Sequence, residues 1–232
     1  MILILGDGLL GAEVQRQTGW PCVSRKKDGF DITNNTNWHE LIPKETSTII
    51  NLIANTDTYS TDYLKMIDIN YRGVKDLVSF CNLQKIKLIH YSTDYVYVNS
   101  DSNASETTIA KPHNMYGISK LLADEYVLGM AKKSLVLRGS QKVEPFPFSK
   151  AFDDVIGNFD YVSVMAEITI QMIEANASGL YNIGTPVKSM YELAKQTNSD
   201  VVPGKAPDHF PKDVTMDLTK MNNFLNYGKK TT

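Results

Sequence analysis

The chain has 232 residues, of which 42% are hydrophobic and 22% charged, with a formal net charge of −2 at pH 7. These values are typical of one large globular α/β domain, and they provide no basic surface for nucleic acid or an anionic membrane. No apolar run is long enough to span a bilayer, and the apolar N-terminus lacks the basic flank of a signal peptide, so we expect a cytoplasmic protein. Cys22 and Cys81 lack metal-ligand spacing, so we expect reduced, buried thiols and no metal site.

Strand-like and helix-like segments alternate along the chain. Short apolar runs typical of buried parallel strands occur at 2–5, 21–24, 47–54, 86–92, 134–138 and 179–184. Helical segments are expected at 9–18, 62–83, 115–131, 163–176 and 189–197. This alternation predicts an α/β fold with a doubly wound parallel sheet of Rossmann type. After Arg138 the pattern weakens, and we expect the tail at 226–232 to be disordered.

Three glycines follow the first predicted strand and open the first predicted helix. Gly6, Gly8 and Gly11 form a G-x-G-x-x-G pattern in "LGDGLLG". Glycines at such positions let the backbone turn tightly beside a pyrophosphate, and the helix N-terminus supplies free N–H groups. The pattern predicts a dinucleotide cofactor, although a glycine-rich turn without a ligand has the same sequence.

The residues after the second predicted strand bear on the choice of cofactor. In this fold an acidic residue there favours NAD, whereas a basic residue accommodates the 2′-phosphate of NADP. Here the sequence is "SRKK", and Arg25 has the fork-like geometry suited to phosphate. We therefore expect NADP(H) to be preferred over NAD(H), with a solvated basic loop as the alternative interpretation.

A hydroxyl-rich strand end and a tyrosine–lysine pair predict the chemistry. The fourth predicted strand ends in "YSTDYVY", which places Ser92, Thr93 and Asp94 at the mouth of the sheet. Tyr116 and Lys120 in "YGISK" share one face of a helix. A nearby lysine should lower the pKa of the tyrosine and make it a usable general acid, while Thr93 positions a carbonyl oxygen. An amphipathic helix with a packed tyrosine and a solvated lysine is the alternative.

The motifs "YSTDYVY" and "KPHNMYGISKLLADEYV" resemble the dTDP-4-dehydrorhamnose reductase family of extended short-chain dehydrogenases/reductases. The resemblance covers residues 1–140 best and implies NADPH-dependent reduction of a nucleotide-linked 4-keto-6-deoxysugar. It implies catalytic roles for Thr93, Tyr116, Lys120 and Asn70, and substrate contacts for Thr93, Asp94 and Tyr116. The implied cofactor-binding residues are Gly6, Gly8, Leu9, Leu10, Gly11, Arg25, Asp31, Ile32, Ile53, Ala54, Thr56, Ser92, Tyr116 and Lys120.

Two departures from the family pattern leave alternatives open. The glycines are spaced one residue more tightly than in the family, and the segment after Arg138 is much shorter. We expect residues 1–140 to form the NAD(P)-binding domain with the catalytic residues, and 141–232 a reduced substrate-binding lobe interwoven with it. A non-catalytic regulatory subunit of the methionine adenosyltransferase beta type, or a reductase or epimerase of another sugar nucleotide, remains possible, as does a homodimer by family analogy.

Overall fold

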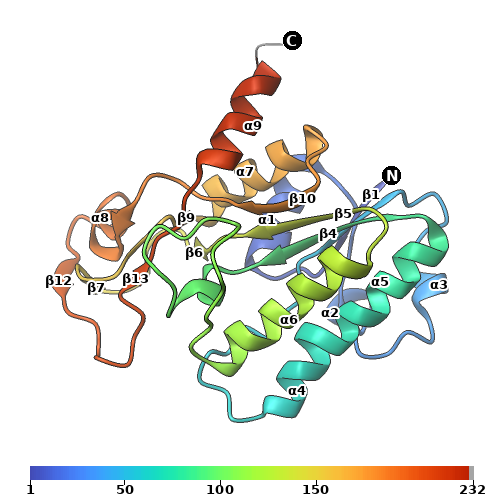
Figure 1. Ribbon diagram of the computed structural model, residues 1–232, viewed down its shortest axis with the longest axis horizontal. Coiled ribbons are helices and arrows are strands. Elements are labelled where there is room, and N and C mark those ends of the chain that lie inside the picture. The colour runs from blue at the N-terminus through green and yellow to red at the C-terminus, as the bar shows by residue number, and fades with distance from the viewer. Residues whose placement is uncertain (230–232) are drawn as a thin grey trace.

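A six-stranded parallel sheet forms the centre of the computed structural model, which describes residues 1–229 (Figure 1). The strands run in the order β10-β5-β4-β3-β1-β2 and are all parallel. Their bounds are β1 (Ile2–Leu5), β2 (Cys22–Val23), β3 (Thr48–Asn51), β4 (Lys87–Ser92), β5 (Ser134–Arg138) and β10 (Gly179–Asn182). The predicted doubly wound sheet is confirmed.

Helices cover both faces of this sheet. The face shown in front in Figure 1 carries α5 (Gly73–Gln84) and α6 (Met115–Met130), and the opposite face carries α1 (Leu9–Thr18) and α7 (Val162–Glu174). Successive strand residues alternate between the two layers, as where Leu3 packs with the α5 side and Ile4 with the α1 side. Because both faces are buried, the strands read as continuous apolar runs in the sequence.

The helix predicted at 62–83 contains an irregular turn. It comprises α4 (Tyr63–Ile67), a π-helical turn η1 (Asp68–Arg72) and α5, without a break in the chain direction. A π turn holds one more residue than a regular helical turn, and such turns are frequent at functional sites. Asn70 lies within η1 and is fully buried.

Short elements lie outside the main layers, and of these the sequence predicted only the helix at 189–197. Beside the first half of the sheet are α2 (Arg25–Asp28), α3 (Trp38–Leu41) and the 3₁₀ turn η2 (Asp94–Tyr97). The small lobe, at the left of Figure 1, consists of β6 (Gln141–Lys142), β7 (Lys150–Phe152), β8 (Ile156–Gly157), β9 (Asp160–Tyr161), β11 (Lys188–Ser189), α8 (Met190–Lys195), β12 (Val202–Gly204) and β13 (Asp213–Val214).

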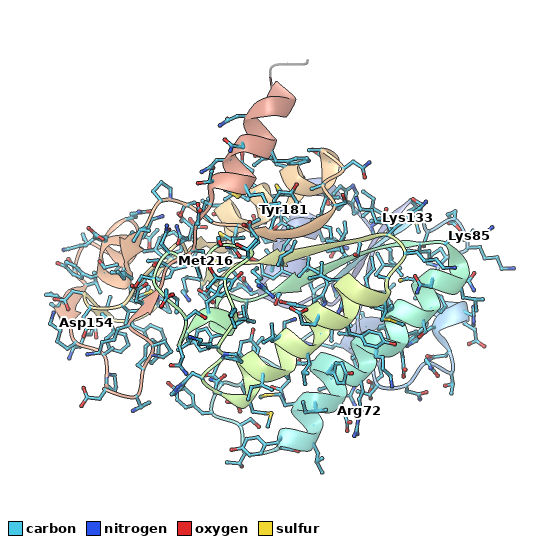
Figure 2. All side chains as sticks on the ribbon, in the orientation of Figure 1. Arg72, Lys85, Lys133, Asp154, Tyr181 and Met216 are labelled. Atoms are coloured by element: carbon cyan, nitrogen blue, oxygen red, sulfur yellow. The ribbon has the colours of Figure 1, made fainter. Side chains whose placement is uncertain are left out.

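The two segments that build the small lobe return to the main body. Figure 2 marks Met216, where the second segment rejoins it, and this side chain is only 2% exposed. The chain then forms α9 (Thr219–Lys229), so the predicted disorder was wrong for residues 226–229, while 230–232 lie outside the described residues. Among the described helices, none is long and apolar enough to cross a membrane.

Candidate active site

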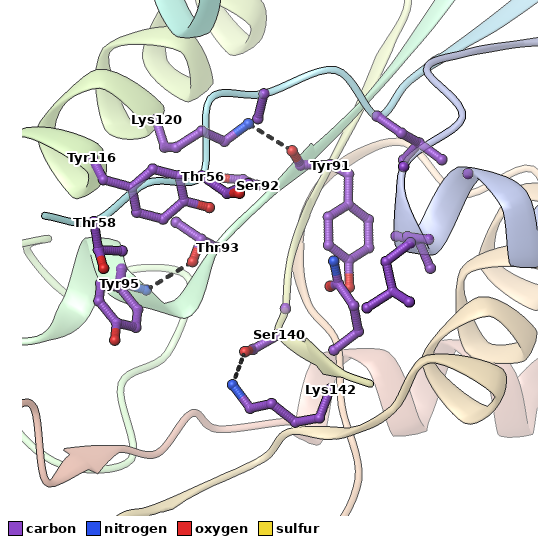
Figure 3. A pocket seen from close by; sticks show the side chains of 18 residues that line it. Thr56, Thr58, Tyr91, Ser92, Thr93, Tyr95, Tyr116, Lys120, Ser140 and Lys142 are labelled. Carbon is purple, nitrogen blue, oxygen red and sulfur yellow. Dashed lines mark hydrogen bonds between the residues drawn. The ribbon is translucent and has the colours of Figure 1, made fainter. Parts of the chain in front are cut away.

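A cavity of about 440 Å³ opens along the carboxyl edge of the central sheet (Figure 3). Its walls come from the segments that follow β1, β3, β4 and β5, together with the start of α6. The chain proceeds from β1 to β2 on one side and later to β3 on the other, so the cavity includes the point where the strand order reverses. In open α/β sheets this is where ligands bind.

The glycine loop after β1 is shaped by close backbone contacts. Gly6 has a φ of +101°, and Gly11 lies so near it that a Cβ at position 11 would be 1.9 Å from the Gly6 carbonyl oxygen. Gly8 caps α1 without any side-chain hydrogen bond, and a Cβ there would meet nothing within 4 Å. The N-terminus of α1 therefore faces open space, as a bound pyrophosphate requires. The predicted residues Gly8, Leu9, Leu10 and Gly11 line the cavity, and Gly6 supports it from behind.

Asn70 connects two walls of the cavity without lining it. Its Oδ1 accepts the Asn55 N–H at 2.7 Å, and its Nδ2 donates to the Asn55 carbonyl at 2.9 Å and to Ser119 Oγ at 2.9 Å. Ser119 in turn donates to the carbonyl of Tyr116 at 2.8 Å. Asn70 thus fixes the loop after β3, which carries the cavity residues Ala54 and Thr56, relative to the helix that carries Tyr116. Ile53 lies under Gly6, with its Cγ1 2.9 Å from a Cβ placed there.

Thr93, Tyr116 and Lys120 lie together in the cavity, with the hydroxyls of the first two near one another in Figure 3. Tyr116 is in the first turn of α6, whose N-cap Asn114 accepts a hydrogen bond from the Gly117 N–H at 2.9 Å. Thr93 caps η2 by accepting the Tyr95 N–H at 3.2 Å. Tyr116 and Lys120 are four residues apart and share one helix face, as predicted.

The protonation of Tyr116 differs from the sequence-based prediction. Burial raises the pKa of Tyr116 to about 12, although the Thr93 hydroxyl opposes this, and the charges of Asp94 and Asp124 raise it further. Lys120 is not among the groups that lower this pKa, and its Nζ donates to the Tyr91 carbonyl at 2.8 Å, towards the sheet. The expectation of a lowered tyrosine pKa was therefore wrong, and Tyr116 is held as a neutral phenol.

Lys120 is itself affected by its surroundings. The residue is only 2% exposed, and burial lowers the pKa of its amine to about 8, while Asp124 opposes the shift. Asp124 Oδ2 accepts hydrogen bonds from Ser92 Oγ at 2.8 Å and from Arg138 Nε at 2.9 Å. The Ser92 hydroxyl is thus directed into the protein, although Ser92 also lines the cavity. Lys120 can change charge near neutral pH.

Asp94 supports the strand end and does not line the cavity. It is 2% exposed and accepts a hydrogen bond from Thr93 Oγ1 at 3.1 Å. Burial raises the pKa of the Asp94 carboxyl, and the Lys142 charge opposes this. The predicted substrate contact from Asp94 is not evident in this geometry, which instead gives Asp94 a role in holding Thr93.

The residues predicted around the adenine end lie apart from this cavity. Arg25 opens α2, its side chain is 75% exposed, and its Nε is 3.3 Å from Asp31 Oδ2. Hydrogen bonds from Thr33, and the Arg25 charge to a smaller extent, lower the pKa of Asp31. Ile32 is buried, and its carbonyl oxygen would lie 2.7 Å from a Cβ at Gly73. Arg25, Asp31 and Ile32 therefore lie close together, and their contacts do not by themselves identify a ligand.

The segment after β5 supplies cavity residues that the sequence interpretation missed: Gly139, Ser140, Gln141 and Lys142. Lys142 Nζ donates to Ser140 Oγ at 2.9 Å and lies 5.1 Å from the centre of the Phe159 ring. No carboxylate lies within salt-bridge distance of Lys142 in the described part of the chain. Lys142 also borders a second, mainly apolar groove of about 900 Å³, lined by the small-lobe residues Val143, Phe146, Phe148, Phe152, Met190 and Phe210.

Comparison with known proteins identifies the family. The model of the family described as the RmlD substrate binding domain matches residues 1–142. The chain belongs to this family. It is 27% identical over 208 residues to a dTDP-4-dehydrorhamnose reductase from Aggregatibacter actinomycetemcomitans, which covers 78% of this chain and 71% of the relative.

Solved structures of similar fold include two proteins in complex with a nicotinamide dinucleotide. A dTDP-4-dehydrorhamnose reductase from Bacillus anthracis, in complex with NADP, superposes with a TM-score of 0.78 at 21% identity, covering 100% of this chain and 98% of the other. A UDP-glucuronic acid 4-epimerase from Bacillus cereus, in complex with NAD, superposes with a TM-score of 0.76 at 18% identity, covering 97% and 90%. At these identities, the likeness establishes that this chain has the same fold as the two solved structures.

Proposed function

We propose that this RmlD family member is an NADPH-dependent reductase of a keto group on a nucleotide-linked 4-keto-6-deoxysugar. The observation that carries the proposal is the meeting of Thr93, Tyr116 and Lys120 in one cavity with the glycine loop. A binding module would not need a phenol, a hydroxyl and a titratable amine at one point. The similarity to curated dTDP-4-dehydrorhamnose reductase supports the choice of substrate class.

A dinucleotide fits the cavity on structural grounds. The uncapped N-terminus of α1, the open space over Gly8 and the close approach of Gly11 to Gly6 provide a cradle that side chains would fill. Leu9, Leu10, Ala54, Thr56 and Ser92 would hold the cofactor, with Lys120 at its ribose. When bound, a reduced nicotinamide supplies the hydride for carbonyl reduction.

The protein's own residues would supply the proton. The raised pKa of Tyr116 keeps its hydroxyl protonated at neutral pH, as a proton donor to an alkoxide must be. Thr93 Oγ1 would hold the carbonyl oxygen beside Tyr116 by turning its single O–H from Asp94 Oδ1 to the substrate. The phenolate left behind is costly in a buried site, so the reaction favours prompt return of a proton to Tyr116.

Lys142 and the apolar groove support an elongated, anionic substrate. The Lys142 amine, which makes no salt bridge with the described residues, lies where the cavity meets the groove, so it is placed to contact a phosphate of a sugar nucleotide. The aromatic residues of the groove offer surfaces for a nucleobase. We assign 1–140 to cofactor binding and catalysis and 141–232 to substrate binding on these grounds.

The test is turnover of NADPH with a panel of nucleotide-linked 4-keto-6-deoxysugars. Tyr116→Phe should reduce kcat by about 10²–10⁴, the usual contribution of a positioned general acid, while thermal melts change little. Tyr126→Phe is a matched control, because Tyr126 is on the same helix and packs on Tyr71 away from the cavity. Near-wild-type turnover by Tyr116→Phe would exclude the phenol as the acid. NADPH binding without any turnover would favour the regulatory alternative.

A further inference from the structure

A layer of polar side chains lies between the sheet and α6, beneath Lys120. At its centre is His90 on β4, whose ring is fully buried. Asn51 on β3 and Asp124 on α6 flank the ring. The chemistry proposed above gives His90 no part, yet its Nε2 is 3.2 Å from Lys120 Nζ.

The hydrogen bonds of Asn51 determine which ring nitrogen of His90 carries the proton. Asn51 Oδ1 accepts the Ile53 N–H at 3.2 Å, so the amide nitrogen Nδ2 is the group that faces His90 Nδ1, also at 3.2 Å. An amide nitrogen can only donate, and therefore Nδ1 must accept. If the Asn51 amide were flipped, its Nδ2 would face the Ile53 N–H, and both groups are donors. The neutral ring thus carries its proton on Nε2.

This tautomer restricts the form of Lys120 that can bond to His90. The Nε2–H group faces Lys120 Nζ, and an ammonium has no lone pair with which to accept it. The amine form does have a lone pair, and it can still donate to the Tyr91 carbonyl at 2.8 Å. The short contact between His90 and Lys120 is therefore a hydrogen bond when Lys120 is neutral.

Asp124 offers a second acceptor for the same proton. Its Oδ1 is 3.7 Å from His90 Nε2 and has no hydrogen-bond partner among the described residues, although it is buried. Its Oδ2 is already engaged by Ser92 and Arg138. A buried acceptor without a donor is unfavourable, and a small movement of the ring would bring Nε2–H to it.

We propose that His90 is a positioning residue whose Nε2–H group donates one hydrogen bond. When Lys120 is neutral, the acceptor is the lysine amine. When Lys120 is protonated, the acceptor is Asp124 Oδ1. The His90 proton stays on Nε2 throughout, and the proton that Lys120 gains or loses is exchanged with the cavity. His90 and Asp124 together thus provide a hydrogen-bonded partner for each charge state of the lysine. They set how readily Lys120 changes charge beside Tyr116.

The electrostatic surroundings agree with this role. Burial, and then the Lys120 charge, lower the pKa of His90 well below its ordinary value, so the ring is neutral. The pKa of Lys120, lowered to about 8, lets both of its forms exist near neutral pH. Beyond His90 itself, the titratable groups around this pair are Asp124 and Tyr116 on α6, Tyr91 on β4, Arg138 on β5 and Asp94 on η2. Strand β3 contributes only the uncharged Asn51.

Nitrogen NMR of the histidine-labelled wild-type protein tests the tautomer without any substrate. We expect His90 to be neutral with its proton on Nε2 from pH 6 to 9. A proton on Nδ1, or a charged ring in that range, would overturn the proposal. Because this measurement uses the wild-type protein, it does not depend on whether a variant folds.

The second measurement is the pKa of Lys120 from the ¹³Cε shift, in the wild-type protein and in His90→Phe. Phenylalanine removes the 3.2 Å bond to the amine and also the longer 3.7 Å contact to Asp124 that serves the charged state. Because the first contact is the shorter one, the pKa should rise, by up to about one unit. A fall would mean that His90 had instead accepted from the ammonium, and a fall or no change overturns the proposal. His90→Gln retains an amide donor and should give a smaller rise. His39→Phe, at an exposed position, is the control and should change nothing.

A kinetic measurement rests on the proposed reductase function and separates it from this inference. If Lys120 must be charged for turnover, the alkaline limb of the kcat/KM profile should move up with its pKa in His90→Phe. A limb that stays in place while the pKa of Lys120 moves would overturn the link to catalysis. The expected NMR results with no reduction of any keto sugar would reject the proposed function and leave the His90–Lys120 assignment standing.

Discussion

The two ends of the carboxyl edge of the sheet are built differently. Under α6, His90, Asp124 and Arg138 are 0–2% exposed and each has several polar neighbours. Beside β2, the Arg25 side chain is 75% exposed and forms an ion pair with Asp31. The buried end has its geometry set by folding, so changes there should affect stability as well as chemistry. The exposed end can be altered with little effect on folding, so it is the place where cofactor preference can vary.

The largest effect should come from Arg138→Met. This removes the charge that pairs with Asp124 at 2.9 Å and the donor to Tyr97 Oη at 2.6 Å, leaving a buried carboxylate poorly compensated. We expect the free energy of unfolding to fall by about 3–5 kcal/mol, measured by urea denaturation. Adding Asp124→Leu should restore part of the loss. A single variant within about 1 kcal/mol of wild type would contradict the claim that this end is rigidly held.

A pH effect should come next, from Lys120. Its pKa is about 8 in the folded protein against 10.5 ordinarily, so between these values the unfolded chain holds the extra proton. The stability of the wild-type protein should therefore rise with pH in this window relative to Lys120→Met, by about 3 kcal/mol in total. Well below pH 8 the difference between the two should be constant. Parallel stability curves across the window would show that Lys120 is not buried as described.

At the junction of the cavity and the groove, Lys142→Met should act on substrate binding. Loss of one charge-assisted contact to a phosphate should raise KM for a sugar nucleotide about tenfold, with kcat little changed. Lys205→Met is the control, since Lys205 is 72% exposed and pairs with Asp153. An unchanged KM would remove Lys142 from the proposed substrate site.

The smallest effect belongs to the exposed end. Arg25→Ala should reduce the preference for NADPH over NADH about fivefold, as expected for an exposed ionic contact worth about 1 kcal/mol. The free energy of unfolding should stay within about 0.5 kcal/mol of wild type. Arg72→Ala removes a comparable exposed pair, with Asp68, and should leave cofactor preference unchanged. A wild-type preference for NADH would contradict the interpretation of "SRKK".

The central sheet could be predicted because its strands are buried on both faces and leave uninterrupted apolar runs. The elements α2 and α3 have four residues each, too few for a period to be visible. The π turn at 68–72 was missed because the helix around it keeps its apolar spacing. The two-residue strands of the small lobe are defined by contacts between distant segments, which no local pattern records.

The candidate site divides in the same way. The motifs predicted that Thr93, Tyr116 and Lys120 would meet, because helix and strand geometry determine where those side chains lie. They could not predict the pKa of Tyr116, which burial raises. Lys142 could have been predicted from the sequence. It follows the end of β5 by four residues, and the other site residues also lie at this carboxyl edge of the sheet.

The extra residue in the π turn has a consequence for insertions and deletions. Removing one residue from 68–72 would restore a regular helix without breaking the chain. Because the π turn absorbs its extra residue, the flanking α4 and α5 would keep their register, and the change would fall on the residues of the turn itself. Asn70 would then turn away from Asn55 and Ser119, which depend on it for their hydrogen bonds. The length of this helix is therefore fixed to the single residue, even though its sequence could accommodate a shorter form.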